Sequence, residues 1–548
     1  MKAIDLYIRQ FRSGTISRRE FVNRLLVLGV GLPTVSAVLS QHAPKARAAT
    51  ASIPTVRPAR AAAQSGGVLR ASFTTDPVGL DPALSGTYAT NLVTELVYAG
   101  LVQYDKDMNI VPDMAESVEV SDDHLTYTFK LRQGVLFHNG QEMTSDDVKF
   151  TIERVRDPAT GAFSQFRVAT VDTVETPDKY TVVVHLNSVM STLLASLASP
   201  YLAIEPRAEV EARGDLMTTM IGTGPFKFVS YEPKKLLVLE KNPDYYIEGQ
   251  PYLDRLEIQF IEDDTSRVNA LRTGAIDFVQ SVPFKLVTGL EHAPGIVLAK
   301  PVETCRWSFL GYNNRRAPFD NPLVRRALSH AMNREGSVQA GYFGYAKPIL
   351  GGPIPEWSWA YPGQDYFSPS PNVEEAKKLL AEAGFPNGFK TTITTSGVYS
   401  ENLAEALVAK DAFKAIGVDC EVIQLDWASL ANAWDVEHDY DIGSLAWGGP
   451  LVDPDDYLYA QFHSTGGWNA VGFADPDVDK LLDATRSTFD QDERKELYAQ
   501  VSTRLCELSP EGFGVLGDLI HAMSDNVQGF HPTYSGMTKW LRETTITA

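Results

Sequence analysis

The stretch that decides the fold is TYTFKLRQGVLFHNGQEMTSDDV, residues 126–148. Its first part, residues 126–131, alternates polar and apolar side chains and predicts a half-buried strand. Asn139-Gly140 then predicts a tight turn, because both residue types tolerate a positive φ. Thr144 and Asp147 have the spacing of a capping box and predict a helix that begins there.

Strands and helices of ordinary length follow on both sides of this stretch. The alternating pattern predicts strands at residues 66–73, 117–120, 180–186, 236–239, 256–261 and 418–425. Apolar residues at helical spacing, with capping residues and terminal glycines, predict helices at residues 88–101, 374–383 and 402–416, and others that begin near 321 and 490. Mixed elements over 548 residues indicate an α/β protein of several lobes.

The composition excludes several classes of protein. The net charge is −20, which argues against a nucleic-acid-binding surface and against tight binding to anionic membranes. The three cysteines, Cys305, Cys420 and Cys506, lie far apart and form no CxxC motif, so they signal neither a zinc site nor a redox pair.

Residues 1–48 differ from the rest of the chain and predict an export signal. They hold eight basic and two acidic residues, and an apolar run at 25–39 follows the basic part. Ahead of this run, Ser17-Arg18-Arg19-Glu20-Phe21-Val22 resembles the twin-arginine export signal, and Ala46-Arg47-Ala48 has the form of a cleavage site. We therefore expect a twin-arginine-type signal peptide at 1–48, a linker at 49–65 and a periplasmic protein.

No motif of catalytic chemistry is present. The sequence holds no HExxH, GxSxG or P-loop, and no two histidines are spaced i, i+4. The acidic runs at 453–456 and 475–477 each contain an Asp-Pro step, which is typical of a helix start. We expect no catalytic residue, no cofactor and no metal.

Taken together, several stretches resemble the peptide/nickel-binding family of extracytoplasmic solute-binding proteins. They are residues 80–82 (LDP), 114–118 (MAESV), 127–140 (YTFKLRQGVLFHNG), 144–148 (TSDDV), 222–226 (GTGPF), 241–246 (KNPDYY) and 324–334 (VRRALSHAMNR). Each is weak by itself, but their order and spacing along the mature chain are specific.

The resemblance implies a periplasmic-binding-protein-like fold with two major halves, a hinge of two crossings, and a ligand in the interlobe cleft. Lobe I would comprise residues 66–99, 222–303 and 510–548, lobe II residues 100–221, and lobe III residues 304–509. The function implied is that of the binding component of an ABC importer. Such a monomer closes on a peptide or other small solute and delivers it to the permease, with no nucleic acid involved.

The resemblance also suggests which residues touch the ligand. In dipeptide-binding relatives a tryptophan at the position of Trp447 lines the cleft, and an aspartate three residues later binds the ligand's ammonium group. Here Pro450 takes the place of that aspartate, and no arginine for a ligand carboxylate is evident in residues 396–400, so a neutral or extended ligand is favoured over a zwitterionic dipeptide. The candidate ligand-binding residues are Trp447, Tyr88, Trp307, Gly449, Tyr399 and Trp427. Arg306 could meet an acidic ligand, but a position at the surface is favoured for it.

Three alternatives stay open at this point. The ligand could be a sugar or an opine-like compound rather than a peptide, or, least favoured because the histidines are scattered, a metal chelate. The same fold could serve a ligand-sensing receptor, or the chain could be a periplasmic hydrolase, although it lacks the motifs of one.

Overall fold

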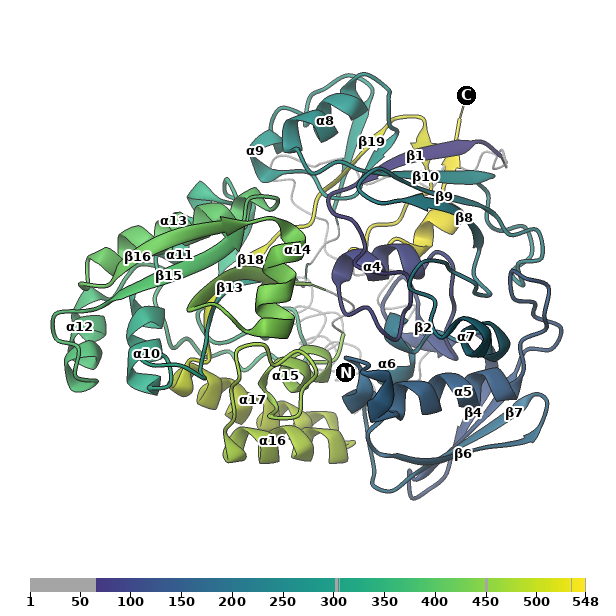
Figure 1. The fold of residues 1–548 in the computed structure, drawn as a ribbon, viewed down its shortest axis with the longest axis horizontal. Coiled ribbons are helices and arrows are strands. Elements are labelled where there is room, and N and C mark those ends of the chain that lie inside the picture. Colours follow the sequence, from purple (N-terminus) through teal and green to yellow (C-terminus); the bar gives the residue numbers. More distant parts are fainter. Residues whose placement is uncertain (1–65, 301–303, 305, 449–451, 534, 548) are drawn as a thin grey trace, which may run out of the picture. The chain divides into compact units, whose positions relative to one another are not determined.

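The computed structural model describes residues 66–300, 304, 306–448, 452–533 and 535–547. Three sheets of four or more strands organise this part of the chain, beside two two-stranded ones, and each of the three has helices packed against it (Figure 1). The predicted α/β class is confirmed. The predicted signal peptide and linker, together with Cys305, Gly449 and Pro450, lie outside the described residues.

The first sheet has seven strands and collects segments from distant parts of the sequence. In sheet order they are β12 (Ile296–Ala299), β19 (His521–Ser524), β11 (Phe278–Val279), β1 (Val68–Phe73), β10 (Arg255–Phe260), β9 (Leu236–Lys241) and β8 (Phe226–Glu232). β1 is parallel to both of its neighbours, and the other pairs are antiparallel. Phe73, Leu239 and Leu256 are buried in its core.

The second sheet is antiparallel and contains the stretch that opened the sequence analysis. Its order is β4 (Ala115–Val120), β5 (Thr126–Leu131), β7 (Thr181–Leu186) and β6 (Val171–Asp178). Helix α5 (Ser145–Arg156) packs on it through Val148, Ile152 and Val155. The predicted capping box of Thr144 and Asp147 is present at its start.

The third sheet has six strands and carries most of the site described below. Its order is β14 (Ala346–Pro348), β18 (Glu511–Gly517), β13 (Arg306–Tyr312), β17 (Ile442–Trp447), β15 (Lys390–Ser396) and β16 (Asp419–Leu425). Since β18 pairs with β13 and β14, the chain stays in this sheet through Gly517, beyond the residue 510 at which lobe I was expected to resume. The chain enters the seven-stranded sheet again only at β19.

The helices of the third sheet pack around three cores. α10 (Pro322–Ala331), α12 (Val373–Glu382) and α13 (Ser400–Lys414) pack around one, and α15 (Asp455–Phe462), α16 (Pro476–Ser487) and α17 (Gln491–Leu508) around another. α11 (Arg334–Ala340) contributes Val338 to the third. The other named elements are β2 (Val102–Tyr104), β3 (Ile110–Pro112), α6 (Leu193–Leu197), α7 (Arg207–Arg213), α8 (Asp264–Arg272), α9 (Phe284–Val287), α14 (Trp427–Ala431), β20 (Val527–Gln528), β21 (Thr545–Ile546) and short 3₁₀ or π turns.

One predicted helix is shorter than expected. The apolar spacing predicted a helix over residues 88–101, but α4 spans only Tyr88–Thr94. The reason is that the carbonyl oxygens of Leu96 and Val97 accept hydrogen bonds from the backbone of Phe226 and Gly224. A Cβ on Gly224 would lie 2.6 Å from the Val97 oxygen, so this close approach requires glycine.

None of the helices in the described part of the chain combines the length and apolar character that crossing a bilayer requires.

Candidate functional site

A cavity of about 160 Å³ lies between segments of the seven-stranded and the six-stranded sheet. From the first side, residues 73–75, 86–89, 92, 280–281, 519 and 535 line it. From the second side, residues 306, 309, 399, 402, 427, 434–435, 445–448 and 468 line it, and Tyr201 reaches it from the segment after α6. Parts of the chain that are remote in sequence therefore meet at one hollow.

Aromatic rings form much of the wall. Trp447 ends β17 and its ring centroid lies 6.0 Å from that of Trp468, edge to face. Trp427 begins α14 and packs against Tyr399 at 5.3 Å. Such faces stack well on the planar or apolar parts of an organic ligand.

A third tryptophan, Trp434, packs closely on the sheet at two glycines, Gly311 and Gly443. It lies in a π-helical turn, Asn432–Glu437, next to β13 and β17. A Cβ built on Gly311 or Gly443 would come within 2.2 Å or 2.5 Å of its ring. Since these strands offer no side chain there, the indole occupies the space and reaches the cavity wall.

Three polar atoms of the wall are left without hydrogen-bond partners among the residues that the structure describes. They are the indole Nε1 atoms of Trp427 and Trp447 and the Oδ1 atom of Asn402, all buried. Because an unpaired buried polar atom costs about 1–3 kcal/mol, a ligand that supplies two acceptors and one donor would recover that cost.

Two charged side chains line the cavity, Arg306 and Asp435. The Arg306 guanidinium donates to Glu401 at 2.7 Å and lies over the Tyr399 ring at 5.3 Å. Its side chain is only 18% exposed, so the expectation of a surface arginine is wrong. Arg306 is the first residue of β13, after the connection from the seven-stranded sheet, and it lines the cavity.

Asp435 differs from Arg306 because it has no ion pair or hydrogen bond within the described residues. It is half-buried, and burial raises the pKa of its carboxyl to about 7. The carboxyl also borders a neighbouring hollow of about 360 Å³ that Arg315, His438 and Trp468 help to line.

The structure brings together four of the candidates that the sequence singled out: Tyr88, Tyr399, Trp427 and Trp447. Trp307 does not line the cavity. It is 1% exposed and packs edge to face with Tyr457 at 5.0 Å, and its ring centroid lies 6.2 Å from that of Trp447, its partner across the β13–β17 ladder. Whether the four lining residues contact ligand stays a prediction.

Sequence reasoning missed other residues of the wall: Asn402, Trp434, Asp435 and Trp468. The sequence pattern places Asn402 only in a helix, although a polar side chain in the first turn of a helix after a strand is a signal that could have found it. No local signal marks Trp434 or Asp435, since a π-helical turn has no sequence pattern of its own.

Contacts across the cavity join its two sides. Thr75 Oγ1 and Tyr399 Oη are 3.1 Å apart, and Ser400 Oγ donates to Asp264 at 3.1 Å. Thr75 and Tyr399 belong to the cavity wall, whereas Ser400 and Asp264 join the two sides outside its lining.

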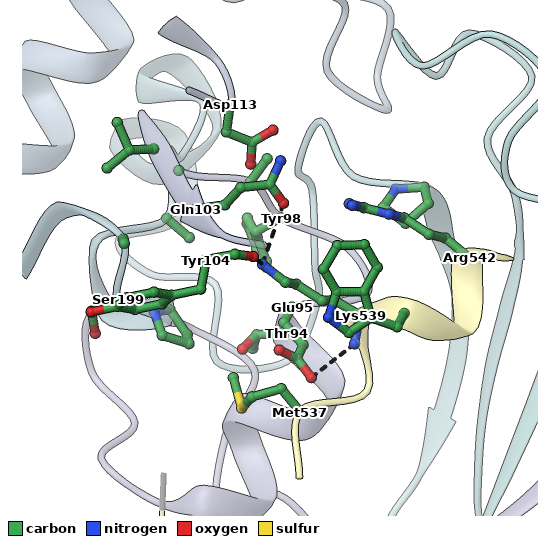
Figure 2. A pocket seen from close by; sticks show the side chains of 18 of the residues that line it. Thr94, Glu95, Tyr98, Gln103, Tyr104, Asp113, Ser199, Met537, Lys539 and Arg542 are labelled. Carbon is green, nitrogen blue, oxygen red and sulfur yellow. Dashed lines mark hydrogen bonds between the residues drawn. The ribbon is translucent and has the colours of Figure 1, made fainter. Parts of the chain in front are cut away.

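Figure 2 shows another hollow, of about 70 Å³, with Glu95, Asp113, Lys539 and Arg542 around it. Its charged groups are engaged: Glu95 accepts from the backbone of Lys539 at 3.0 Å, and Lys539 Nζ donates to the Tyr104 oxygen at 2.6 Å. Burial raises the pKa of Glu95 to about 7 and lowers that of Lys539 to about 8. No residue between 226 and 532 lines it except Tyr245 and Tyr246, so it does not lie between the two larger sheets.

Within the described residues, no group of three or more His, Cys, Asp or Glu side chains is placed to hold a metal ion. The arrangement suits reversible binding: aromatic faces, unpaired donors and an acceptor, and one unpaired carboxylate.

Comparisons with known proteins agree with this geometry. Residues 109–469 match the family described as bacterial extracellular solute-binding proteins, family 5 middle. Heme-binding protein A of Haemophilus influenzae is 31% identical over 471 residues, which cover 79% of this chain and 84% of that protein. Glutathione-binding protein GsiB of Escherichia coli K12 is 29% identical, with coverage of 84% and 90%.

Solved structures give the same result. The periplasmic binding protein AgaA from Agrobacterium tumefaciens R10, in complex with agropinic acid, matches with a TM-score of 0.82 and 32% identity over 88% of this chain and 99% of that one. The ABC transporter-associated binding protein DppA of Helicobacter pylori, in complex with the peptide STSA, matches with a TM-score of 0.81 and 28% identity over 88% and 98%. These relatives are binding proteins and not enzymes, in agreement with the sequence prediction. The chain belongs to the family 5 bacterial extracellular solute-binding proteins.

Proposed function

We propose that this chain captures a peptide or another small organic solute in the cavity between its seven-stranded and six-stranded sheets and passes it unaltered to the permease of an ABC importer. The observation that carries the proposal is the cavity wall itself. It combines aromatic rings with unpaired indole donors and an unpaired amide oxygen on the side of the six-stranded sheet, and Tyr88 and residues 73–75 line the opposite side.

The physical basis of capture is a shift between open and closed arrangements. A solute that touches Tyr88 on one side and Trp447 on the other has its full set of contacts only when both sides are near. Its binding free energy therefore favours the closed arrangement, which the importer can distinguish from the empty one.

Two ligand classes have support from the relatives. The peptide STSA occupies DppA, and agropinic acid, an opine, occupies AgaA. A peptide is our first candidate, because the unpaired donors and acceptor of the wall match the alternating groups of a peptide backbone. An opine is the second candidate, supported by the 32% identity to AgaA.

We place this activity in the periplasm. The basic and apolar order of residues 1–48 and the pair Arg18-Arg19 support export by the twin-arginine route, and the family acts outside the cytoplasm. We also propose that the protein works as a monomer.

The experiment is native mass spectrometry of the protein purified from its own host, to detect a co-purified solute. Calorimetry with that solute should then show that Trp447→Ala weakens binding by about 1–3 kcal/mol, through loss of the aromatic contact. Trp357→Ala, which truncates a tryptophan outside the cavity, is the control and should bind as the wild type does. Wild-type affinity in Trp447→Ala would refute the assignment of this cavity.

A further inference from the structure

The wall of the cavity has an uncompensated negative charge. Of the two charged side chains on it, Arg306 is neutralised by Glu401 at 2.7 Å. Asp435 has no positively charged partner within 4 Å among the described residues, although Arg315 lines the adjoining hollow. Arg315 instead donates to the backbone oxygens of Ala470 and Asn469, at 2.6 Å and 3.2 Å.

The place of Asp435 is fixed by the packing around it. Its neighbour Trp434 is seated on Gly311 and Gly443, and the Trp434 ring lies 4.5 Å from that of Tyr440. The π-helical turn that holds both residues is a geometry found often at functional sites. The carboxylate therefore stands at a defined point of the wall rather than on a free loop.

The rings near Asp435 suit a positively charged group. Trp434, Trp468 and Tyr201 line the same cavity, and the electron-rich faces of such rings attract cations. The carboxylate is also close enough to Tyr201 to affect it: burial is the main cause that raises the pKa of the Tyr201 hydroxyl, and the charges of Asp456 and Asp435 add to it.

We propose that Asp435 binds the positively charged nitrogen of the ligand, a protonated amine, in the pocket that Trp434, Trp468 and Tyr201 form beside it. This inference rests on the proposed function of the cavity. In this proposal the Asp435 carboxylate, on the π-helical turn, provides the negative charge for the amine. Pro450, at the position where dipeptide-binding relatives carry an aspartate, has no charge to offer. The ligand class becomes amine-bearing peptides or other amines.

The test compares two probe mixtures on purified protein freed of bound solute. The first contains short peptides of uncharged residues together with alkyl and aryl amines. The second is the same mixture after exhaustive N-acetylation, which removes the positive charge and leaves most of each molecule unchanged. Mass spectrometry of the retained molecules reports binding.

We expect the wild type to retain members of the first mixture about 10- to 100-fold better than their acetylated forms, the range of a charge-assisted hydrogen bond. Asp435→Asn should lose that preference. Asp439→Asn, which removes an exposed carboxylate a few residues away, should keep it. Because Asp435 has no partner in the fold, Asp435→Asn should also unfold at the wild-type temperature or higher.

The proposal is wrong if Asp435→Asn keeps the preference, if the wild type retains both mixtures equally, or if it retains no amine. Trp447→Ala separates this failure from failure of the proposed function. If Trp447→Ala loses retention while Asp435→Asn does not, the cavity is the binding site and only the anchor is wrong. If both variants retain the probes as the wild type does, the cavity is not the site.

Discussion

At the scale of single residues, the cavity takes its character from side chains whose polar atoms folding leaves unpaired. Trp427, Trp447 and Asn402 each have such an atom, and Asp435 has a whole carboxylate. Arg334, in comparison, is fully buried and donates to the backbone oxygens of Phe513 and Ser329. Unpaired groups that would destabilise a core are useful where a ligand completes them.

The carboxyl of Asp435 predicts a pH dependence of amine binding. Burial raises its pKa to about 7, so below that pH the carboxyl is protonated and the incoming cation must displace a proton. Affinity should fall by up to about tenfold per pH unit as the pH drops below 7, and should be nearly constant above it. Calorimetry with an amine from the retained set, between about pH 5.5 and about pH 8, measures this.

The other charged or titratable residues that line the cavity or the adjoining hollow are Tyr88, Tyr201, Arg306, Arg315, Tyr399 and His438, and the charge of Asp435 also acts on Tyr440. Of these, only histidine is a residue type that changes charge in the neutral range. His438→Asn is the control, because asparagine tolerates the left-handed backbone at this position (φ 52°). A pH dependence that vanishes in His438→Asn and persists in Asp435→Asn would contradict the assignment.

At the scale of elements, segments with clear hydrophobic periodicity and capping residues could be predicted, whereas the π-helical turn Asn432–Glu437 could not. The strand, turn and capped helix of residues 126–156 appear as expected, since periodicity and caps act locally. Trp447 could be assigned to the cavity through the resemblance to dipeptide-binding relatives, and Tyr88 as an aromatic residue at the start of a predicted helix. Trp434 and Asp435 could not, because their place depends on two glycines of separate strands that leave room for an indole.

Gly443→Ala tests this dependence. The added methyl would meet the Trp434 ring at 2.5 Å and a Leu445 methyl at 2.7 Å, so the ring and the π-helical turn must move. We expect a changed tryptophan emission spectrum and at least about tenfold weaker retention of amines, the lower end of the loss predicted for Asp435→Asn.

Gly289→Ala is the matched control for that experiment. Its methyl would meet the flexible Arg272 guanidinium at 3.2 Å and the Leu286 oxygen at 3.5 Å, far from the cavity lining. If the two glycine variants had equal emission spectra and retained amines equally well, the contact of the Trp434 ring with Gly443 would not be required for amine binding.

At the scale of the whole molecule, buried ion pairs join segments that the sequence separates widely. Arg167, in the 3₁₀ turn Gln165–Val168, donates to Asp456 of α15 at 2.5 Å, and both side chains are nearly buried. Close by, Arg486 binds Asp455 and also donates to the backbone oxygen of Phe166. These contacts tie the helical group of α15 and α16 to the segment that precedes β6.

Arg167→Met should therefore destabilise the protein strongly. It leaves Asp456 buried without its cation, and we expect the free energy of unfolding to fall by about 3 kcal/mol in urea denaturation. Lys149→Met, which removes the exposed partner of Glu153 at 3.8 Å, should change it by less than about 0.5 kcal/mol. Losses of similar size in the two variants would mean that the buried pair contributes no more than a surface pair.

Two passages of the chain run between the larger sheets, and each links a strand of one directly to a strand of the other. β12 is followed by β13, and β18 by β19. The four strands are also neighbours within their sheets, since β12 pairs with β19 and β13 with β18. Both connections therefore leave one sheet and enter the other between neighbouring strands, and a closing motion of the two sides would need to bend the chain only at these two places.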